Sequence, residues 1–182
     1  MSEQVFTDAL VAELAKKTGV CWLTYAPPYS DTPVTHAAWH VWVDVEGAAA
    51  LYVVSGGTEQ PLHGIERADR VEVTMRSKEN GGRLMTWVAA ASPVRPDDDL
   101  WEPVTAALVS GRLNVPDLAT AAAGWAETSH VTRLAPTGQL VEQPGSLSDA
   151  AHLATPVTTP ATTRGALPRV LHRRVKRRPK LS

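Results

Sequence analysis

The sequence predicts a small, mainly β domain of the α+β class, with five or six strands forming a barrel and helices beside it. Short runs of alternating or β-branched residues recur between residues 20 and 94 and again at 129–134, which is typical of strands joined by hairpins. Helical periodicity is confined to three segments, at the N-terminus and between residues 96 and 127. No alternation of strands with helices is visible, so a parallel sheet is not expected.

The first half of the chain predicts one helix and three strands. Residues 4–18 carry an apolar stripe at helical spacing, and residues 20–25 are β-forming. A proline-containing loop separates them from a strand at 35–43, which pairs with 49–54 as an antiparallel hairpin. On the 35–43 strand, alternation places His36, Ala38, His40 and Trp42 on one face and Ala37, Trp39, Val41 and Val43 on the other.

The second half predicts two more hairpin strands, two helices and a closing strand. One or two helical turns are expected within 62–69, then strands at 71–76 and 83–94 joined by a tight turn at Asn80, Gly81 and Gly82. A helix is expected to begin at 96–99, where three aspartates suit its N-terminus, and to end at Gly111. A second helix at 114–127 leads to a strand at 129–134.

Length and composition bound the class of protein. The chain has 182 residues and 43% apolar residues, enough for one domain with a hydrophobic core. A single cysteine, Cys21, can form neither an internal disulfide nor a thiolate zinc site. No run approaches the roughly 18 apolar residues of a membrane span, and the N-terminus lacks a signal-peptide pattern. We therefore expect a cytoplasmic protein.

Composition and charge divide the chain into three parts. We expect a domain at 1–136, a flexible linker rich in Pro, Thr and Ser at 137–166, and a basic tail at 167–182. The first 163 residues hold all 19 acidic and ten basic residues, a net charge of −9, whereas the remainder carries +8. The tail could contact nucleic acid or an anionic membrane, or it could fold back on the acidic body.

The loop at 55–60 is the first candidate site. Gly56 and Gly57 would let backbone N–H groups approach a ligand, and Ser55 and Thr58 add hydroxyl groups, an arrangement that can hold a phosphate. The alternative is an ordinary connection between a strand and a helix. Val54 leads into this loop.

Cations flank the next hairpin. Arg76, Lys78 and Arg83 could supply charge and bidentate recognition to a phosphate, or they could be solvated and paired with neighbouring glutamates. His36 and His40 lack a third metal ligand at a recognisable spacing, so lining a cofactor pocket is the better expectation for one of them. No motif for a nucleophilic serine, a P-loop or a dinucleotide-binding turn is present.

These elements resemble a known family. The runs 21–25, 35–43, 51–56 and 71–83 are similar to those of actinobacterial-type members of the pyridoxamine 5′-phosphate oxidase-like superfamily, over residues 5–136. The resemblance implies a six-stranded split β-barrel. It also implies a homodimer with FMN or a deazaflavin coenzyme in a groove at the subunit interface, and hence an oxidoreductase acting on a small organic substrate.

The resemblance also implies which residues surround the cofactor. They are His36, Trp39, Val54, Ser55, Gly56, Gly57, Thr58, Arg76, Lys78 and Arg83. It names no catalytic residue and no metal ligand. Many relatives carry a lysine shortly after the third strand, where this chain has Glu59 and Gln60. Glu59 would repel a phosphate unless it points away, so the sequence also leaves open a non-catalytic cofactor-binding module whose basic tail targets an anionic partner.

Overall fold

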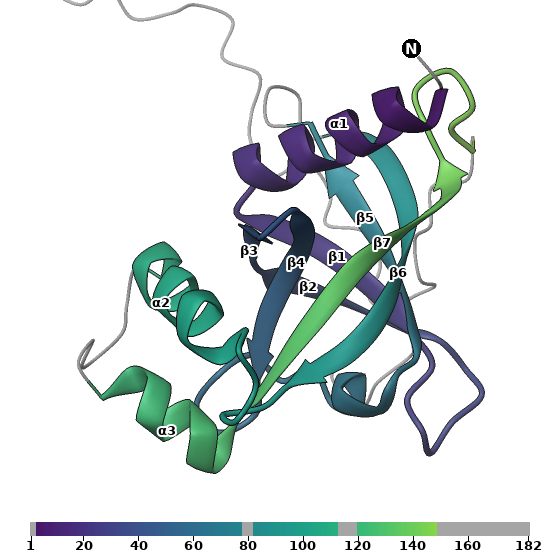
Figure 1. Cartoon of the computed structure of the whole chain (residues 1–182). Coiled ribbons are helices and arrows are strands. Elements are labelled where there is room, and N and C mark those ends of the chain that lie inside the picture. Colours follow the sequence, from purple (N-terminus) through teal and green to yellow (C-terminus); the bar gives the residue numbers. More distant parts are fainter. Residues whose placement is uncertain (1–2, 78–81, 113–119, 149–182) are drawn as a thin grey trace, which may run out of the picture. The chain divides into compact units, whose positions relative to one another are not determined.

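A computed structural model of the chain describes residues 3–77, 82–112 and 120–148 (Figure 1). The helices are α1 (Glu3–Lys17), α2 (Trp101–Gly111) and α3 (Ala121–Thr128), with a 3₁₀ turn η1 (Ile65–Arg67). The strands are β1 (Val20–Tyr25), β2 (Val34–Trp39), β3 (Val41–Val45), β4 (Ala48–Ser55), β5 (Arg70–Arg76), β6 (Arg83–Val94) and β7 (His130–Glu142).

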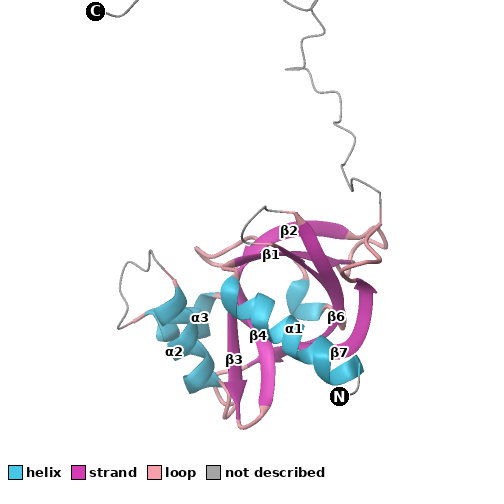
Figure 2. Cartoon of the chain, turned by 90° about the horizontal axis from the view of Figure 1, so that it is seen from above, coloured by secondary structure: helices cyan, strands magenta, loops and turns pink. Residues whose placement is uncertain are grey.

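All seven strands form one antiparallel sheet that curls back on itself. Its strand order is β2-β1-β5-β6-β7-β4-β3. The two edge strands, β2 and β3, follow each other in the chain with only His40 between them. The two edges of the sheet must therefore meet at this residue. Seen from above, the strands curl around α1 (Figure 2).

The junction of the two sheet edges at His40, called the seam below, divides the strand that the sequence predicts at 35–43. The imidazole Nε2 donates a hydrogen bond to the carbonyl oxygen of Ala15 in α1, at 3.1 Å. Burial lowers the pKa of His40 below its usual value. The segment at 34–45 pairs with β1 before His40 and with β4 after it. His40 contacts helix α1 at the point where this change of partner occurs.

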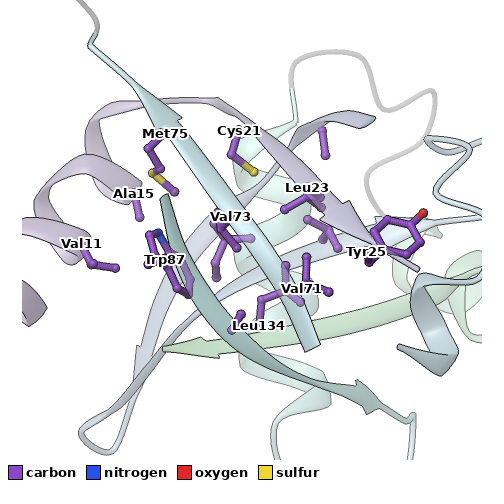
Figure 3. Packing of buried hydrophobic residues seen from close by; sticks show 14 of the residues in the cluster. Val11, Ala15, Cys21, Leu23, Tyr25, Val71, Val73, Met75, Trp87 and Leu134 are labelled. Carbon is purple, nitrogen blue, oxygen red and sulfur yellow. The ribbon is translucent and has the colours of Figure 1, made fainter. Parts of the chain in front are cut away.

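The larger core lies between the inner face of the sheet and α1, which crosses one end of the barrel (Figures 1 and 2). Val11 and Ala15 of α1 join buried side chains from β1, β5, β6 and β7, among them Leu23, Val73 and Trp87 (Figure 3). Cys21 is fully buried here, and burial raises the pKa of its thiol to about 12. Its thiol is therefore protonated at neutral pH and serves packing rather than chemistry.

A second core lies on the outer face of β3, β4 and β7, beneath α2 and α3. Tyr52 and Val54 of β4 pack there with Val104, Leu108 and Trp125 from the two helices. Because α2 and α3 pack on the strand that leads into residues 55–60, the helices are in a position to control that loop.

Most of the predicted elements are confirmed, together with the mainly β fold class. Both predicted faces of the 35–43 segment are also confirmed, because Ala38 and Trp42 pack with the first core and Trp39, Val41 and Val43 with the second. Division of this segment at His40 gives the sheet a seventh strand. No helix of the described residues is long and apolar enough to cross a membrane.

Three boundaries differ from the expectation. Helix α2 begins at Trp101, not at 96–99, because the carboxylate of Asp98 accepts the backbone N–H of Arg95 at 2.7 Å and holds a turn instead. The predicted helix at 114–127 is described only from residue 120, and α3 begins at Ala121. Strand β7 runs to Glu142, past the expected domain end at residue 136. The linker and tail beyond residue 148 lie outside the described residues.

Candidate functional site

The loop between β4 and η1 folds tightly on itself at its start. The backbone N–H of Gly56 donates to the carbonyl of Gln60 at 3.2 Å, and the N–H of Glu59 donates to the carbonyl of Gly56 at 2.9 Å. Gly56 and Gly57 have φ angles of 83° and 57°, a left-handed conformation that favours glycine. The two glycines are therefore required by the turn itself.

A groove with a volume of about 370 Å³ opens on one side of this loop. Its lining residues come from four separate segments: Pro28 and Tyr29, Ser55 and Gly56, the stretch from Leu62 to Gly64 with Glu66 and Arg67, and His130 at the start of β7. Ser55 is buried and pairs with His130 across β4 and β7. The groove thus joins two predicted site residues, Ser55 and Gly56, to basic side chains that the sequence did not single out.

The wall opposite the loop is fixed by close packing. Tyr25 donates its hydroxyl proton to the carbonyl oxygen of His63 at 3.2 Å, and burial, with Tyr29 and Glu66 nearby, raises the pKa of Tyr25 to about 12. Gly64 has φ of 86°, and a Cβ there would lie 2.7 Å from Cδ of Pro28. His63 is therefore presented on a rigid turn.

Glu59 points away from this groove. Its carboxylate Oε1 forms an ion pair with Nη1 of Arg112 and accepts the indole N–H of Trp125 at 2.9 Å. Only 2% of the Glu59 side chain is exposed, and Glu59 does not line the groove. The negative charge that the sequence places beside a proposed phosphate site is therefore neutralised on the helical side of the loop.

Trp39 and Val54 also belong to the helical side. Trp39 packs against the second core, and the guanidinium of Arg112 lies 5.9 Å from the centre of its ring. The side chain of Val54 is fully buried in that core, and its carbonyl accepts a hydrogen bond from Gln60. Both residues therefore support the loop from behind, while Gly57 and Thr58 lie exposed at its tip.

His36 lies apart from the loop, on the inner face of β2. It pairs with Leu23 across the β1–β2 ladder, and its ring centre is 5.9 Å from that of Tyr25. No group of three or more His, Cys, Asp or Glu side chains in the described part of the chain is arranged to hold a metal ion.

The predicted cations lie at the far end of the barrel. The guanidinium of Arg76 sits 4.8 Å from the centre of the Trp22 ring. Arg83 forms an ion pair with Glu142 at 2.9 Å and donates to the carbonyl of Ser148 at 2.7 Å. Lys78 lies outside the described residues.

Within a single chain, therefore, the loop residues and the cations of the predicted site lie far apart. Ser55 pairs with His130 at the start of β7, whereas Arg83 contacts Glu142 at its end. Strand β7 has 13 residues, which at about 3.3 Å each span roughly 40 Å when straight. In Figure 1, β4 and β5 also end at opposite ends of the barrel.

Four residues near the loop have no counterpart in the sequence-based site: His63, Arg67, Arg112 and His130. They come from three segments: His63 and Arg67 from the stretch around η1, Arg112 from the end of α2, and His130 from the start of β7. Only the fold, through the β4–β7 pairing and the packing of α2, brings them to the same loop.

No protein-family model matches the sequence, and no curated protein matches it either. Solved structures do match. The haem storage protein HutZ of Vibrio cholerae is 18% identical with a TM-score of 0.51, covering 71% of this chain and 89% of its own. A conserved hypothetical protein of Mycobacterium tuberculosis is 13% identical with a TM-score of 0.52, covering 75% and 81%.

A candidate pyridoxamine 5′-phosphate oxidase of Listeria innocua is 15% identical with a TM-score of 0.50, covering 74% of this chain and 98% of its own. At such identities a structural likeness establishes the fold alone. The strand order and these matches together show that the chain has the split-barrel fold of pyridoxamine 5′-phosphate oxidase-like proteins.

Proposed function

We propose that the protein is a flavin- or deazaflavin-dependent oxidoreductase that acts on a small organic substrate, with its cofactor at a homodimer interface. The observation that carries this proposal is the groove beside Ser55 and Gly56, which combines a buried polar floor with three basic side chains and one acidic side chain, Glu66. The split-barrel fold that the chain shares with a candidate pyridoxamine 5′-phosphate oxidase supports the same class.

The groove fits the phosphate-bearing end of such a cofactor. Glycine-rich backbone and a serine hydroxyl can approach phosphate oxygens closely. The imidazoles of His63 and His130 and the guanidinium of Arg67 can donate hydrogen bonds to a phosphate. The Arg67 Nε lies 3.9 Å from the Glu66 carboxylate, so a phosphate would compete with that exposed ion pair. Glu59, which would oppose an anion, is paired with Arg112 and turned away.

A second subunit would complete the site. Arg76 and Arg83 lie at the opposite end of β7 from the groove, so in our proposal they reach the same cofactor only from a partner chain. The outer face of β1 supports such an interface, since Val20 is 46% exposed there and Trp22 lies under the Arg76 guanidinium. Exposed apolar and aromatic groups with an arginine are typical of subunit interfaces.

When bound, the cofactor would carry the hydride, as flavin-type cofactors do. The protein would bind and orient it. The hydrogen bonds that close the loop and fix the His63 turn are all formed within the chain, so the groove would be preorganised for binding.

The test is the visible spectrum of the purified protein, followed by titration with FMN and with the deazaflavin coenzyme. We expect a bound chromophore, or binding of one of the two at about 100 μM or below, within the range of typical enzyme ligands. Analytical ultracentrifugation should show a dimer. Absence of both chromophore and binding would refute the proposal.

A further inference from the structure

The loop that forms one side of the groove is held from behind by the two helices of the second core. Glu59 contacts Arg112 at the end of α2 and Trp125 of α3. The hydroxyl of Ser129, just after α3, donates to the carbonyl of Gly56 at 3.3 Å. A Cβ on Gly57 would lie 3.0 Å from the hydroxyls of both Thr128 and Ser129. The loop therefore has one face in contact with α3 and one face open.

The strongest of these contacts is a buried ion pair. The Glu59 side chain is 2% exposed and that of Arg112 is 21% exposed. Removing one partner of a buried pair leaves an uncompensated charge, which destabilises a protein strongly. Loss of either the Glu59 carboxylate or the Arg112 guanidinium alone should therefore destabilise the folded protein.

The pair bears directly on the geometry of the loop. The backbone N–H of Glu59 donates to Gly56, so the residue whose carboxylate is fixed by α2 also closes the turn. The other carboxylate oxygen, Oε2, is buried and has no hydrogen-bond partner within the described chain. Among the described residues, Arg112 and Trp125 are the partners that fix the position of the Glu59 carboxylate.

We propose that Glu59 is a positioning residue: through Arg112 and Trp125 it couples α2 and α3 to the loop, so that Ser55 to Thr58 hold the shape that binds a phosphate-bearing ligand. This inference rests on the proposed function of the groove. Glu59 does not line the groove, so it would act on the ligand through the shape of the loop and not by direct contact.

Amide hydrogen exchange of the cofactor-free protein tests the coupling without any ligand. In Glu59→Gln and in Arg112→Met, the amides of Gly56 and Glu59, which close the loop, should exchange about tenfold faster or more. The double variant has no unpaired buried charge but also lacks the ion pair, so its loop amides should still exchange faster than in the wild type. A return to the wild-type rate would assign the effect of the single variants to the unpaired charge and overturn the coupling. Trp125→Phe keeps the ion pair and should cause a smaller change in the same direction.

Val73→Ala is the control for a general loss of stability. Val73 is buried in the first core, away from the loop, so this variant should lower global stability while the loop amides keep their rate relative to the rest of the sheet. If Val73→Ala accelerates the loop amides as much as Glu59→Gln does, or if Glu59→Gln leaves them unchanged, the coupling is overturned.

Titration with FMN and with riboflavin, which lacks the phosphate, then connects the loop to ligand binding. Glu59→Gln should weaken FMN binding about tenfold or more and leave riboflavin binding nearly unchanged. If the wild type binds neither FMN nor the deazaflavin while the exchange result holds, the proposed function fails and the coupling stands. Equal FMN affinity in wild type and Glu59→Gln overturns the positioning role and leaves the proposed function intact.

Discussion

The side chain of Gln60 forms hydrogen bonds with both backbone groups of Trp39. Its Oε1 accepts the N–H of Trp39 at 2.7 Å, and its Nε2 donates to the Trp39 carbonyl at 2.9 Å and to the Val54 carbonyl at 3.2 Å. Trp39 is the last residue of β2 and Val54 lies near the end of β4. One amide side chain thus bridges two strands that are not neighbours in the sheet, beside the seam at His40.

Gln60→Ala should therefore destabilise the barrel. Three partly buried backbone groups lose their partner, which we expect to lower the free energy of unfolding by about 2–4 kcal/mol. Urea unfolding followed by tryptophan fluorescence measures it. Gln139→Ala is the matched control, because Gln139 accepts only an exposed hydrogen bond from Arg70, and it should cost about 0.5 kcal/mol or less. Equal losses in the two variants would contradict the bridging role.

Gly57→Ala should cost more than Gly47→Ala. Both glycines have a positive φ, 57° and 84°, so an alanine at either site is strained by about 1–2 kcal/mol. At Gly57 the new methyl would also lie 3.0 Å from two hydroxyls and 3.1 Å from the Thr128 carbonyl, whereas nothing lies within 4 Å at Gly47. The difference between the two losses in urea unfolding isolates the contact of the loop with α3. Equal losses in the free energy of unfolding would mean that the loop can move away from α3 without destabilising the protein.

The faces of the strands could be predicted from the sequence because side-chain alternation is local. His36 to Val43 kept its predicted alternation even though the strand is divided. The division itself was not predictable, since it depends on the contact of His40 with Ala15, 25 residues earlier in the chain. Alternation continues through the seam and therefore carries no sign of it.

The candidate site was predictable only where the signal was local. Positive φ at Gly56 and Gly57 is a property of glycine, and both occupy the turn that the sequence indicated. The ion pair of Glu59 with Arg112 joins residues 53 apart, and no pattern links them. For that reason the sequence could place a glutamate beside the proposed phosphate site, but the direction of its carboxylate depends on the position of α2.

The stability of the protein should fall as the pH drops below about 6.5, the ordinary pKa of histidine. Burial lowers the pKa of His40 in the folded protein, so the unfolded chain binds a proton at a pH where the folded chain does not. Stability present above about pH 6.5 is lost as the pH falls towards the folded pKa, by at most about 1.4 kcal/mol per pH unit.

Urea unfolding between pH 7.5 and 5.5 measures this slope, and His40→Gln should reduce it. His63→Gln is the control, because His63 is exposed and the hydrogen bond that it forms with Tyr25 uses its backbone carbonyl, not its imidazole. An unchanged slope in His40→Gln would assign the pH dependence to other groups.

Deletion of residues 150–182 should separate the enzyme from a tail-dependent binding module. The compact unit that contains the barrel ends at Ser148, so this truncation leaves the Arg83 contact with Ser148 intact. An oxidoreductase should keep its cofactor affinity and turnover. Any binding to duplex DNA or to phosphatidylserine vesicles at low salt should be lost with the eight basic residues that follow Thr163. If the full chain binds neither probe, the tail has no role with anionic partners.

Subunit complementation should reveal whether one cofactor contacts two chains. Thr58 is exposed in the loop, and Arg76 is exposed at the opposite end of the barrel. Thr58→Asp and Arg76→Glu each place a negative charge in one half of the proposed site, so each homodimer should lose FMN binding at both sites.

When the two variants are unfolded together and refolded as a mixture, half of the dimers are mixed, and each mixed dimer has one site with both halves intact. About a quarter of the wild-type binding sites should therefore return in an equal mixture. The amount of FMN bound per chain at saturation measures this recovery, and no recovery is possible if both residues contact the cofactor from the same chain.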